Sequence, residues 1–308
     1  MARAAPAASR AVSIISFLTA HSSRRFTISE LVQHLGMNIA SAHATLAVLQ
    51  EAGFVLRDPV HRTYVLGPAL AATGFAALGQ HPAVEAAVEQ AEILSEELDA
   101  EVGVTATAGR DVIFLARRGP APLATAIGYP GDRSPLLAPI GAVFMAWADE
   151  ETTGAWLARA EITGRSAEHF RQVLAEIRAR GFSVPLKSIA APAIMHAMER
   201  VRSEPTDEEA EHELTGVLQQ NEEMLLLFEG LSPTEQVTFK TVAAPIFDEI
   251  GQVLLSLSIT GPDQPVPLAE VMGLGRRVSQ AAAVATRRGR GRVPGVDLPP
   301  RLPTRRTG

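Results

Sequence analysis

The sequence contains no cysteine among its 308 residues. This absence excludes disulfide bonds, thiolate metal sites and cysteine nucleophiles. It is compatible with a reducing cytoplasm, which is where we expect the protein to act. Almost half of the residues are hydrophobic, which is enough to build cores, and the length predicts two domains rather than one.

Long apolar runs are also missing. The most apolar stretch, residues 136–148, contains a proline, and it falls short of the roughly 20 residues that a membrane-spanning helix needs. The apolar stretch near the N-terminus is short and continues into a helical pattern, so we do not expect a signal peptide. We therefore predict no membrane contact.

The usual catalytic motifs are absent as well. The chain has no G-x-S-x-G, no P-loop, no G-x-G-x-x-G after a predicted strand and no H-E-x-x-H. Its histidines are scattered without metal-ligand spacing. We therefore predict no enzyme, no catalytic residues, no metal site and no cofactor.

Charge is distributed unevenly along the chain. Residues 1–70 carry a net charge of +3, residues 286–308 carry +6, and the region between carries −15. A basic head on an acidic body indicates that only the head meets a polyanion. An acidic body would be repelled by DNA.

The N-terminal region has the pattern of a helix-turn-helix. A first helix is expected from a cap at Ser9 to about His21. Thr27 and Glu30 are spaced as a capping box for a second helix, which Gly36 ends. Asn38 can cap a third helix that runs to about residue 52, with an inner face of Ile39, Ala42, Leu46 and Leu49. This arrangement lays its last helix in the major groove of DNA.

A wing follows these helices. Residues 54–57 and 63–66 read as two short strands joined by a turn. Arg57, His61 and Arg62 stand at the tip and edge of this hairpin, where they can reach phosphates or the minor groove.

The ordered run from Ser9 through Thr27-Ile28-Ser29-Glu30-Leu31, Leu35-Gly36-Met37 and Phe54-Val55-Leu56-Arg57-Asp58 to Tyr64-Val65-Leu66-Gly67-Pro68 resembles the IclR family of bacterial transcription regulators. The resemblance implies double-stranded operator DNA as a partner and a linker helix that begins at Gly67-Pro68. The candidate DNA contacts are Arg10, Thr27, Asn38, Ile39, Ser41, His43, Ala44, Arg57, His61 and Arg62.

The third helix departs from this family, which often has basic residues at the positions of Ile39 and Ala44. Its outward face offers few donors for base edges. Specificity would then depend on Asn38, Ser41, thymine methyl contacts, the wing and DNA shape. The alternative is a head that has lost DNA binding and now contacts proteins. His43 is equally compatible with a DNA contact and with a partly buried packing role.

The body alternates helices and strands. Helical spacing is expected over residues 82–98, 140–148, 167–180 and 268–286. Strands are expected over residues 102–108, 112–116, 123–128, 237–244 and 253–260. An antiparallel sheet with helices on its faces is an α+β fold.

The body resembles the GAF-like effector-binding domain of the same family, on the residues Arg180-Gly181-Phe182-Ser183-Val184, Val242-Ala243-Ala244-Pro245-Ile246-Phe247-Asp248 and Ser256-Leu257-Ser258-Ile259-Thr260-Gly261-Pro262. The resemblance implies an effector between the sheet and the loop around Pro139. Few donors converge there, so we expect an apolar or aromatic effector. The candidate contacts are Leu123, Gly128, Leu136, Pro139, Ile140, Gly141, Thr241, Ser258 and Thr260, several of which could instead be core residues.

These readings combine into one prediction. Residues 1–8 would be a flexible N-terminus, 9–67 the winged helix-turn-helix, 68–81 the linker helix, 82–286 the GAF-like domain and 287–308 a disordered basic tail. The acidic helical stretch at 188–236 would be a variable insertion, and its charged face would be either an interface or a surface exposed to solvent. The whole would be a dimeric or tetrameric transcription regulator, a repressor or an activator. The alternative is a small-molecule sensor that acts through protein contacts, with a vestigial DNA-binding head.

Overall fold

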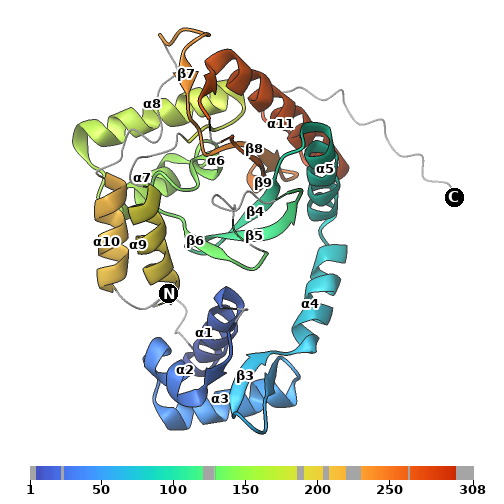
Figure 1. Ribbon diagram of the computed structural model, residues 1–308, viewed down its shortest axis with the longest axis vertical. Coiled ribbons are helices and arrows are strands. Elements are labelled where there is room, and N and C mark those ends of the chain that lie inside the picture. Colours follow the sequence, from blue (N-terminus) through green and yellow to red (C-terminus); the bar gives the residue numbers. More distant parts are fainter. Residues whose placement is uncertain are drawn as a thin grey trace, which may run out of the picture.

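The computed structural model describes residues 5–21, 24–120, 128, 130–185, 191–203, 208–219, 230–262 and 264–295. We call residues 5–67 the head and residues 82–295 the body. The head lies at one end of the molecule, and a single helix connects it to the body along one side (Figure 1).

The head consists of helices packed on a small antiparallel sheet, whose strand order is β1-β3-β2. Its apolar core takes side chains from all of these helices and strands, with Phe17, Phe26 and Leu31 at its centre. The elements are α1 (Pro6–Ala20), β1 (Phe26–Thr27), α2 (Ile28–Leu35), α3 (Ile39–Glu51), β2 (Val55–Arg57) and β3 (Thr63–Leu66).

The connecting helix α4 (Pro68–Gly79) starts where Gly67 passes very close to the backbone of Gly53. A Cβ on Gly67 would lie 2.2 Å from the Gly53 carbonyl oxygen, so only glycine fits there. None of the side chains of α4 is buried.

The body is built on an antiparallel sheet with the strand order β6-β5-β4-β9-β8. The strands are β4 (Val102–Ala108), β5 (Asp111–Arg118), β6 (Arg133–Pro135), β8 (Thr241–Phe247) and β9 (Val253–Thr260). A separate pair joins β7 (Gln236–Val237) to β10 (Val266–Pro267).

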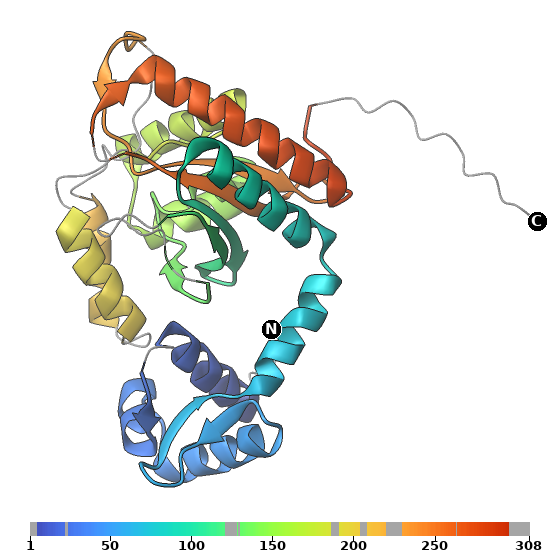
Figure 2. The ribbon, with the colours of Figure 1, turned by 45° about the vertical axis from the view of Figure 1, so that its right-hand side comes forward.

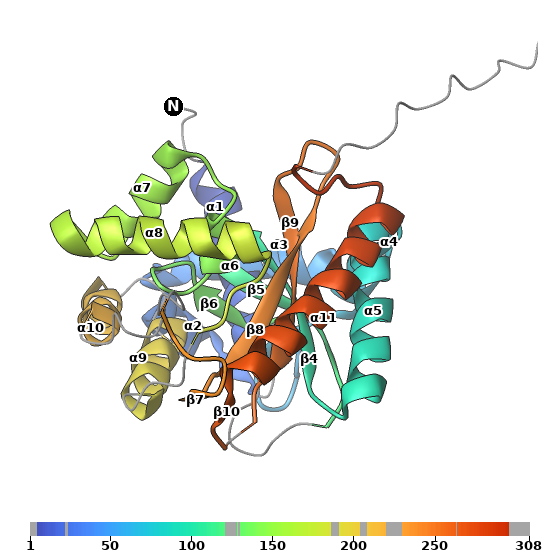
Figure 3. The same ribbon diagram turned by 90° about the horizontal axis from the view of Figure 1, so that it is seen from above.

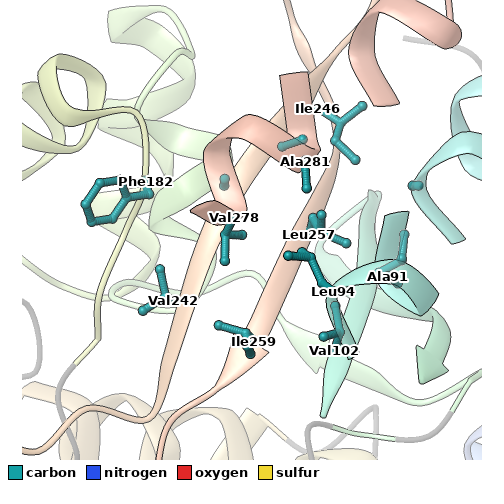
Figure 4. Packing of buried hydrophobic residues seen from close by; sticks show 14 of the residues in the cluster. Ala91, Leu94, Val102, Phe182, Val242, Ile246, Leu257, Ile259, Val278 and Ala281 are labelled. Atoms are coloured by element: carbon teal, nitrogen blue, oxygen red, sulfur yellow. The ribbon is translucent and has the colours of Figure 1, made fainter. Parts of the chain in front are cut away.

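One face of this sheet packs on α5 (Pro82–Leu98) and α11 (Leu268–Arg288), which lie side by side (Figure 3). Because side chains alternate between the faces of a strand, Leu255, Leu257 and Ile259 all point toward these helices. Figure 4 shows Ala91 and Leu94 of α5 and Val278 and Ala281 of α11 close to Leu257 and Ile259. This layer is the largest apolar core of the body.

The other face is covered by a second core. Its helices are α6 (Ala142–Met145), α7 (Glu150–Arg159), α8 (Gly164–Arg180), α9 (Ala191–Ser203) and α10 (Glu208–Gln219). The last two form a helical hairpin within the stretch that the sequence marks as a variable insertion.

Several helices begin or end at residues other than those predicted from the sequence. The first helix begins at Pro6 rather than at Ser9, because a proline in the first turn presets the helical backbone. The helix expected over residues 140–148 is shortened to α6, since Gly141 takes a left-handed conformation with φ of 85° just before it. Helix α8 starts at Gly164, earlier than expected.

The expected tail boundary at residue 287 is also too early. Helix α11 continues to Arg288, and the chain beyond it hydrogen-bonds to the body, with Gly291 N donating to Thr286 O and Arg292 N donating to Asp248 O. The rest of the expected tail, residues 296–308, lies outside the described residues, as does most of the strand expected at 123–128.

Candidate nucleic-acid interface and effector site

The second helix of the head is fixed by the predicted capping box. The Thr27 backbone N–H donates to Glu30 Oε2 at 2.6 Å, and the Glu30 N–H donates to Thr27 Oγ1 at 3.3 Å. These bonds favour the ionised carboxylate, so they hold the pKa of Glu30 below its ordinary value. The Thr27 hydroxyl also donates to Glu30 at 2.8 Å, which commits it to the cap.

The turn into the third helix follows the prediction. Gly36 ends α2 with a left-handed φ of 59°, and the Asn38 side chain accepts from Ser41 N at 2.8 Å to cap α3. Helix α3 therefore starts at a fixed point and packs against α1 and α2. It lies at the end of the molecule that faces away from the body (Figures 1 and 2).

The outward face of α3 is apolar and poor in donors. Val48 is 65% exposed and Ile39 is 53% exposed, so the expectation that Ile39 belongs to the inner face is wrong. Ala44 and His43 are also exposed, which removes the packing interpretation of His43. Instead the inner face includes Thr45, whose hydroxyl donates to the Ser41 carbonyl oxygen.

The wing is shaped by an acidic residue. The Asp58 carboxylate accepts the backbone N–H groups of His61 and Val60, and these bonds lower the pKa of Asp58. Arg62 follows with φ of 55°. Arg57, His61 and Arg62 are all exposed, and the Arg57 guanidinium lies 5.9 Å from the centroid of the Tyr64 ring.

Sequence reasoning missed a further basic residue at the wing. Arg25, which reads as part of a polar connection, places its guanidinium 3.4 Å from the Asp58 carboxylate and remains exposed. The sequence does show two adjacent basic residues, Arg24 and Arg25. Only the pairing of β1 with β3 reveals that they lie beside the wing. Arg10, by contrast, is partly buried on α1, and its Nε is buried without a hydrogen-bond partner among the described residues.

The predicted effector residues of the sheet lie together. Thr241 pairs with Thr260 across β8 and β9, and Ser258 lies between Gly103 and Ala243. The buried hydroxyl residues Thr105, Ser256, Ser258 and Thr260 share the face opposite α5 and α11. This face is therefore richer in hydroxyl groups than the sequence analysis assumed.

The predicted loop residues lie beside this face. A Cβ on Gly141 would lie 2.2 Å from Leu136 Cδ1 and 3.7 Å from Val112 Cγ2 of β5, so the loop is tightly closed on the sheet. The Ala138–Pro139 peptide bond is cis. The Ile140 carbonyl oxygen accepts from Trp156 Nε1. Gly128, with φ of 58°, lies against the Phe114 ring, while Leu123 lies outside the described residues.

A buried ion pair on this face was not anticipated. The fully buried side chain of Glu101, immediately before β4, pairs with Arg117 of β5, which is largely buried. The Thr260 hydroxyl donates to Glu101 Oε2 at 3.1 Å. Nothing in the local sequence distinguishes Glu101 from the acidic residues of the helix surfaces, because the pair forms only when the two strands align.

The described residues form a winged helix-turn-helix joined by α4 to an α+β domain, and known proteins share this arrangement. Residues 7–59 match the IclR helix-turn-helix domain. The fold is shared with the IclR transcriptional regulator of Alicyclobacillus acidocaldarius, at 21% identity and a TM-score of 0.66, covering 93% of this chain and 100% of that one. No curated protein matches the chain.

Two further solved structures are similar over nearly the full length. Pseudomonas aeruginosa HmgR is 21% identical with a TM-score of 0.59, covering 92% of this chain and 99% of that one. Thermotoga maritima IclR is 17% identical with a TM-score of 0.53, covering 92% and 98%. The chain thus carries the IclR helix-turn-helix domain, the DNA-binding domain of a class of transcription regulators, and it has the fold of IclR regulators.

The described residues also lack two other kinds of feature. None of their helices is both long and apolar enough to cross a membrane. The same residues contain no group of histidine and carboxylate side chains that could hold a metal ion.

Proposed function

We propose that this protein is a cytoplasmic transcription regulator that binds operator DNA through its head and responds to a small molecule bound in its body. The observation that carries the proposal is the IclR helix-turn-helix, with α3 facing away from the body and an arginine-bearing wing beside it. The function rests on binding rather than on turnover.

The basic side chains would supply most of the DNA affinity. Arg25, Arg57 and Arg62 are exposed around the wing, where they can reach phosphates or the minor groove. Helix α3 offers Asn38, Ser41 and His43 as polar groups, with Ile39 and Ala44 available to contact thymine methyl groups. Operator recognition would therefore lean on DNA shape as well as on base contacts.

The effector would bind between the hydroxyl-rich sheet face and the loop that contains Pro139. Leu136 and Ile140 offer an apolar side, in keeping with an apolar or aromatic ligand. The hydroxyls of Ser258 and Thr260 offer the opposite, polar side. The Ser134 hydroxyl is buried without a hydrogen-bond partner among the described residues, so an effector with an aromatic or apolar body and polar substituents fits best.

The proposed assembly is a dimer, or a tetramer built from dimers. Helix α4 has no charged residue and no buried side chain, and Phe75 is 75% exposed. An exposed apolar helix of this kind is suited to packing against a second copy of itself. A twofold pair of heads would then match a near-palindromic operator.

The test is selection of sheared genomic DNA by the purified full-length protein at roughly physiological salt, followed by sequencing. The proposal expects a sharp near-palindromic site. The R57E/R62E variant should lose the enrichment, whereas the control R171E, which changes an exposed arginine of the body, should keep it. Absence of any preference over random competitor DNA would contradict the proposal.

A second candidate is a sensor that acts through protein contacts. The exposed Ile39 and Val48 on α3 favour it, because an apolar helix face suits a protein partner. In that case the I39E/V48E variant should lose the partner, while R57E/R62E should have no effect. Diffuse DNA enrichment that disappears as salt is added would make this candidate the leading one.

A further inference from the structure

The head touches the body at a second place, away from the connecting helix. Thr19, near the end of α1, lies so close to Gly131 that a Cβ on Gly131 would be 3.0 Å from Thr19 Cγ2. Helix α1 also contacts α9. Figures 1 and 2 show α4 on one side of the molecule and α1 below α9 on the other. The head is therefore held from two sides.

The α9–α10 hairpin is firmly attached to the body. Ile194 and Ala197 of α9, and Leu214 and Leu218 of α10, are buried in the second core. The Gln219 side chain donates to the Ala160 carbonyl oxygen at 2.8 Å. Arg200 and Glu213 form an ion pair that joins the two helices.

One arginine connects this hairpin to the loop beside the sheet. Arg159 Nε donates to Glu211 of α10 at 2.8 Å. The same guanidinium donates through Nη1 to the Leu136 carbonyl oxygen at 3.1 Å and to the Arg110 carbonyl oxygen at 2.9 Å. Glu211 also accepts from Arg110 at 3.1 Å. A movement of the loop at Leu136 would therefore displace Glu211 and its helix.

We propose that the α9–α10 hairpin and the turn at Gly131 form a clamp on α1, and that Arg159 makes this clamp sensitive to the loop at residues 136–141. Helix α4 alone would leave the head free to change its orientation, because none of the side chains of this helix is buried. The closed clamp holds the head in one orientation relative to the body. The conformation of the loop at residues 136–141 shifts the equilibrium between the closed and the open clamp. The clamp itself does not depend on the proposed function, although its use in controlling DNA binding does.

The first experiment measures the head–body distance without DNA or effector. The chain has no cysteine, so V60C on the wing and I250C on the body can be spin-labelled specifically. Both sites are well exposed. Labelled protein diluted with unlabelled protein should give a narrow distance distribution by pulsed electron spin resonance.

The perturbing variant is T19W, which places a bulky side chain against Gly131. The matched control is S13W, on an exposed position of the same helix. The clamp predicts a broadened distribution for T19W alone, with the thermal unfolding of the head unchanged in both. Equal distributions for T19W, S13W and the parent protein would overturn the proposal.

The second experiment tests the connection through Arg159. Because linkage is reciprocal, opening the clamp should loosen the loop, and the reverse should also hold. In T19W and in R159Q, amide exchange of residues 136–146 should accelerate by about fivefold or more, a typical coupling between sites. R171Q, which removes an exposed arginine–glutamate pair, is the control. Unchanged exchange of this loop in T19W would reject the connection, whether or not the protein binds DNA.

Discussion

Thr27 shows how a single side chain can fix the geometry of a DNA-binding head. Its hydroxyl and backbone N–H both bond to Glu30, so α2 begins at one defined residue. The turn at Gly36 and the start of α3 are then set by a helix of only two turns. The predicted DNA contact of Thr27 remains a prediction, but its capping role is clear.

We expect Thr27→Ala to lower the free energy of unfolding of the head by about 1 kcal/mol, because N-cap losses are of this size. The carboxylate of Glu30 has a lowered pKa in the folded head, so its stabilising contribution is present at neutral pH. It is lost as the pH falls from the unfolded pKa of about 4.3 through the folded pKa.

Glu30→Gln is the matched control, since glutamine can cap but does not titrate. Thermal unfolding followed from pH 7 to pH 3 checks both expectations. A parent protein and a Glu30→Gln variant with the same pH dependence would contradict this assignment.

Glu101 illustrates the opposite case, a buried carboxylate that forms an ion pair with Arg117. We expect Arg117→Met to destabilise the body by about 3–5 kcal/mol, because it strips a buried carboxylate of its ion pair. The E101Q/R117M double variant should recover most of this loss, since it leaves no buried charge. Chemical denaturation measures both. If the double variant is less stable than Arg117→Met, the unpaired carboxylate is not the cause of the destabilisation.

At the scale of elements, sequence patterns predicted most of the long helices and strands, but they missed helix α7 and failed at loops. The capping box, the Gly36 turn and helix α5 followed from residue type and periodicity alone. The short α6 did not, because Gly141 and Pro139 can be read as part of a helix until the loop's contact with Leu136 is known.

The candidate site, like the fold, was predicted only in part from the sequence. The exposure of Arg57 and Arg62 followed from the wing pattern. Among the features that did not follow are the outward position of Ile39 and the pair of Glu101 with Arg117. Each depends on how elements distant in sequence align, and neither leaves a local periodic signal.

Helix α4 carries the clearest prediction for an element. We expect Phe75→Glu to shift the purified protein toward smaller species, because a charge at an exposed apolar position opposes packing of two such helices. Light scattering after gel filtration gives the mass. Thr73→Glu is the control, since Thr73 is already polar and exposed on the same helix. An unchanged mass for Phe75→Glu would place the subunit contact elsewhere.

At the scale of the whole molecule, charge separates the two ends. The head is basic and the central region strongly acidic, so DNA approaching the body is repelled while DNA approaching the wing is attracted. The arrangement in Figure 1, with α3 on the far side of the head, lets the acidic body stay distant from the duplex.

The strength of this effect can be measured through salt. Each arginine on a phosphate contributes close to one unit to the slope of log affinity against log salt, so R57A/R62A should reduce that slope by about two. Titrations of the selected operator at several salt concentrations provide the slope. R171A, on the body, should leave it unchanged. A fall in affinity at constant slope would mean that neither arginine meets a phosphate.

The exposed helix α4 also has a consequence for how relatives of this protein could diverge. Adding one residue to an α-helix advances it by roughly 1.5 Å and turns whatever follows by about 100°. Because no side chain of α4 is buried, the fold would tolerate such an insertion. The insertion would rotate the head relative to the body, so the head would meet a different position along the DNA helix. The rotation would also separate Thr19 from Gly131. Relatives that recognise operators with a different half-site spacing should therefore also differ in the sequences of α1 and of the turn at residues 130–132.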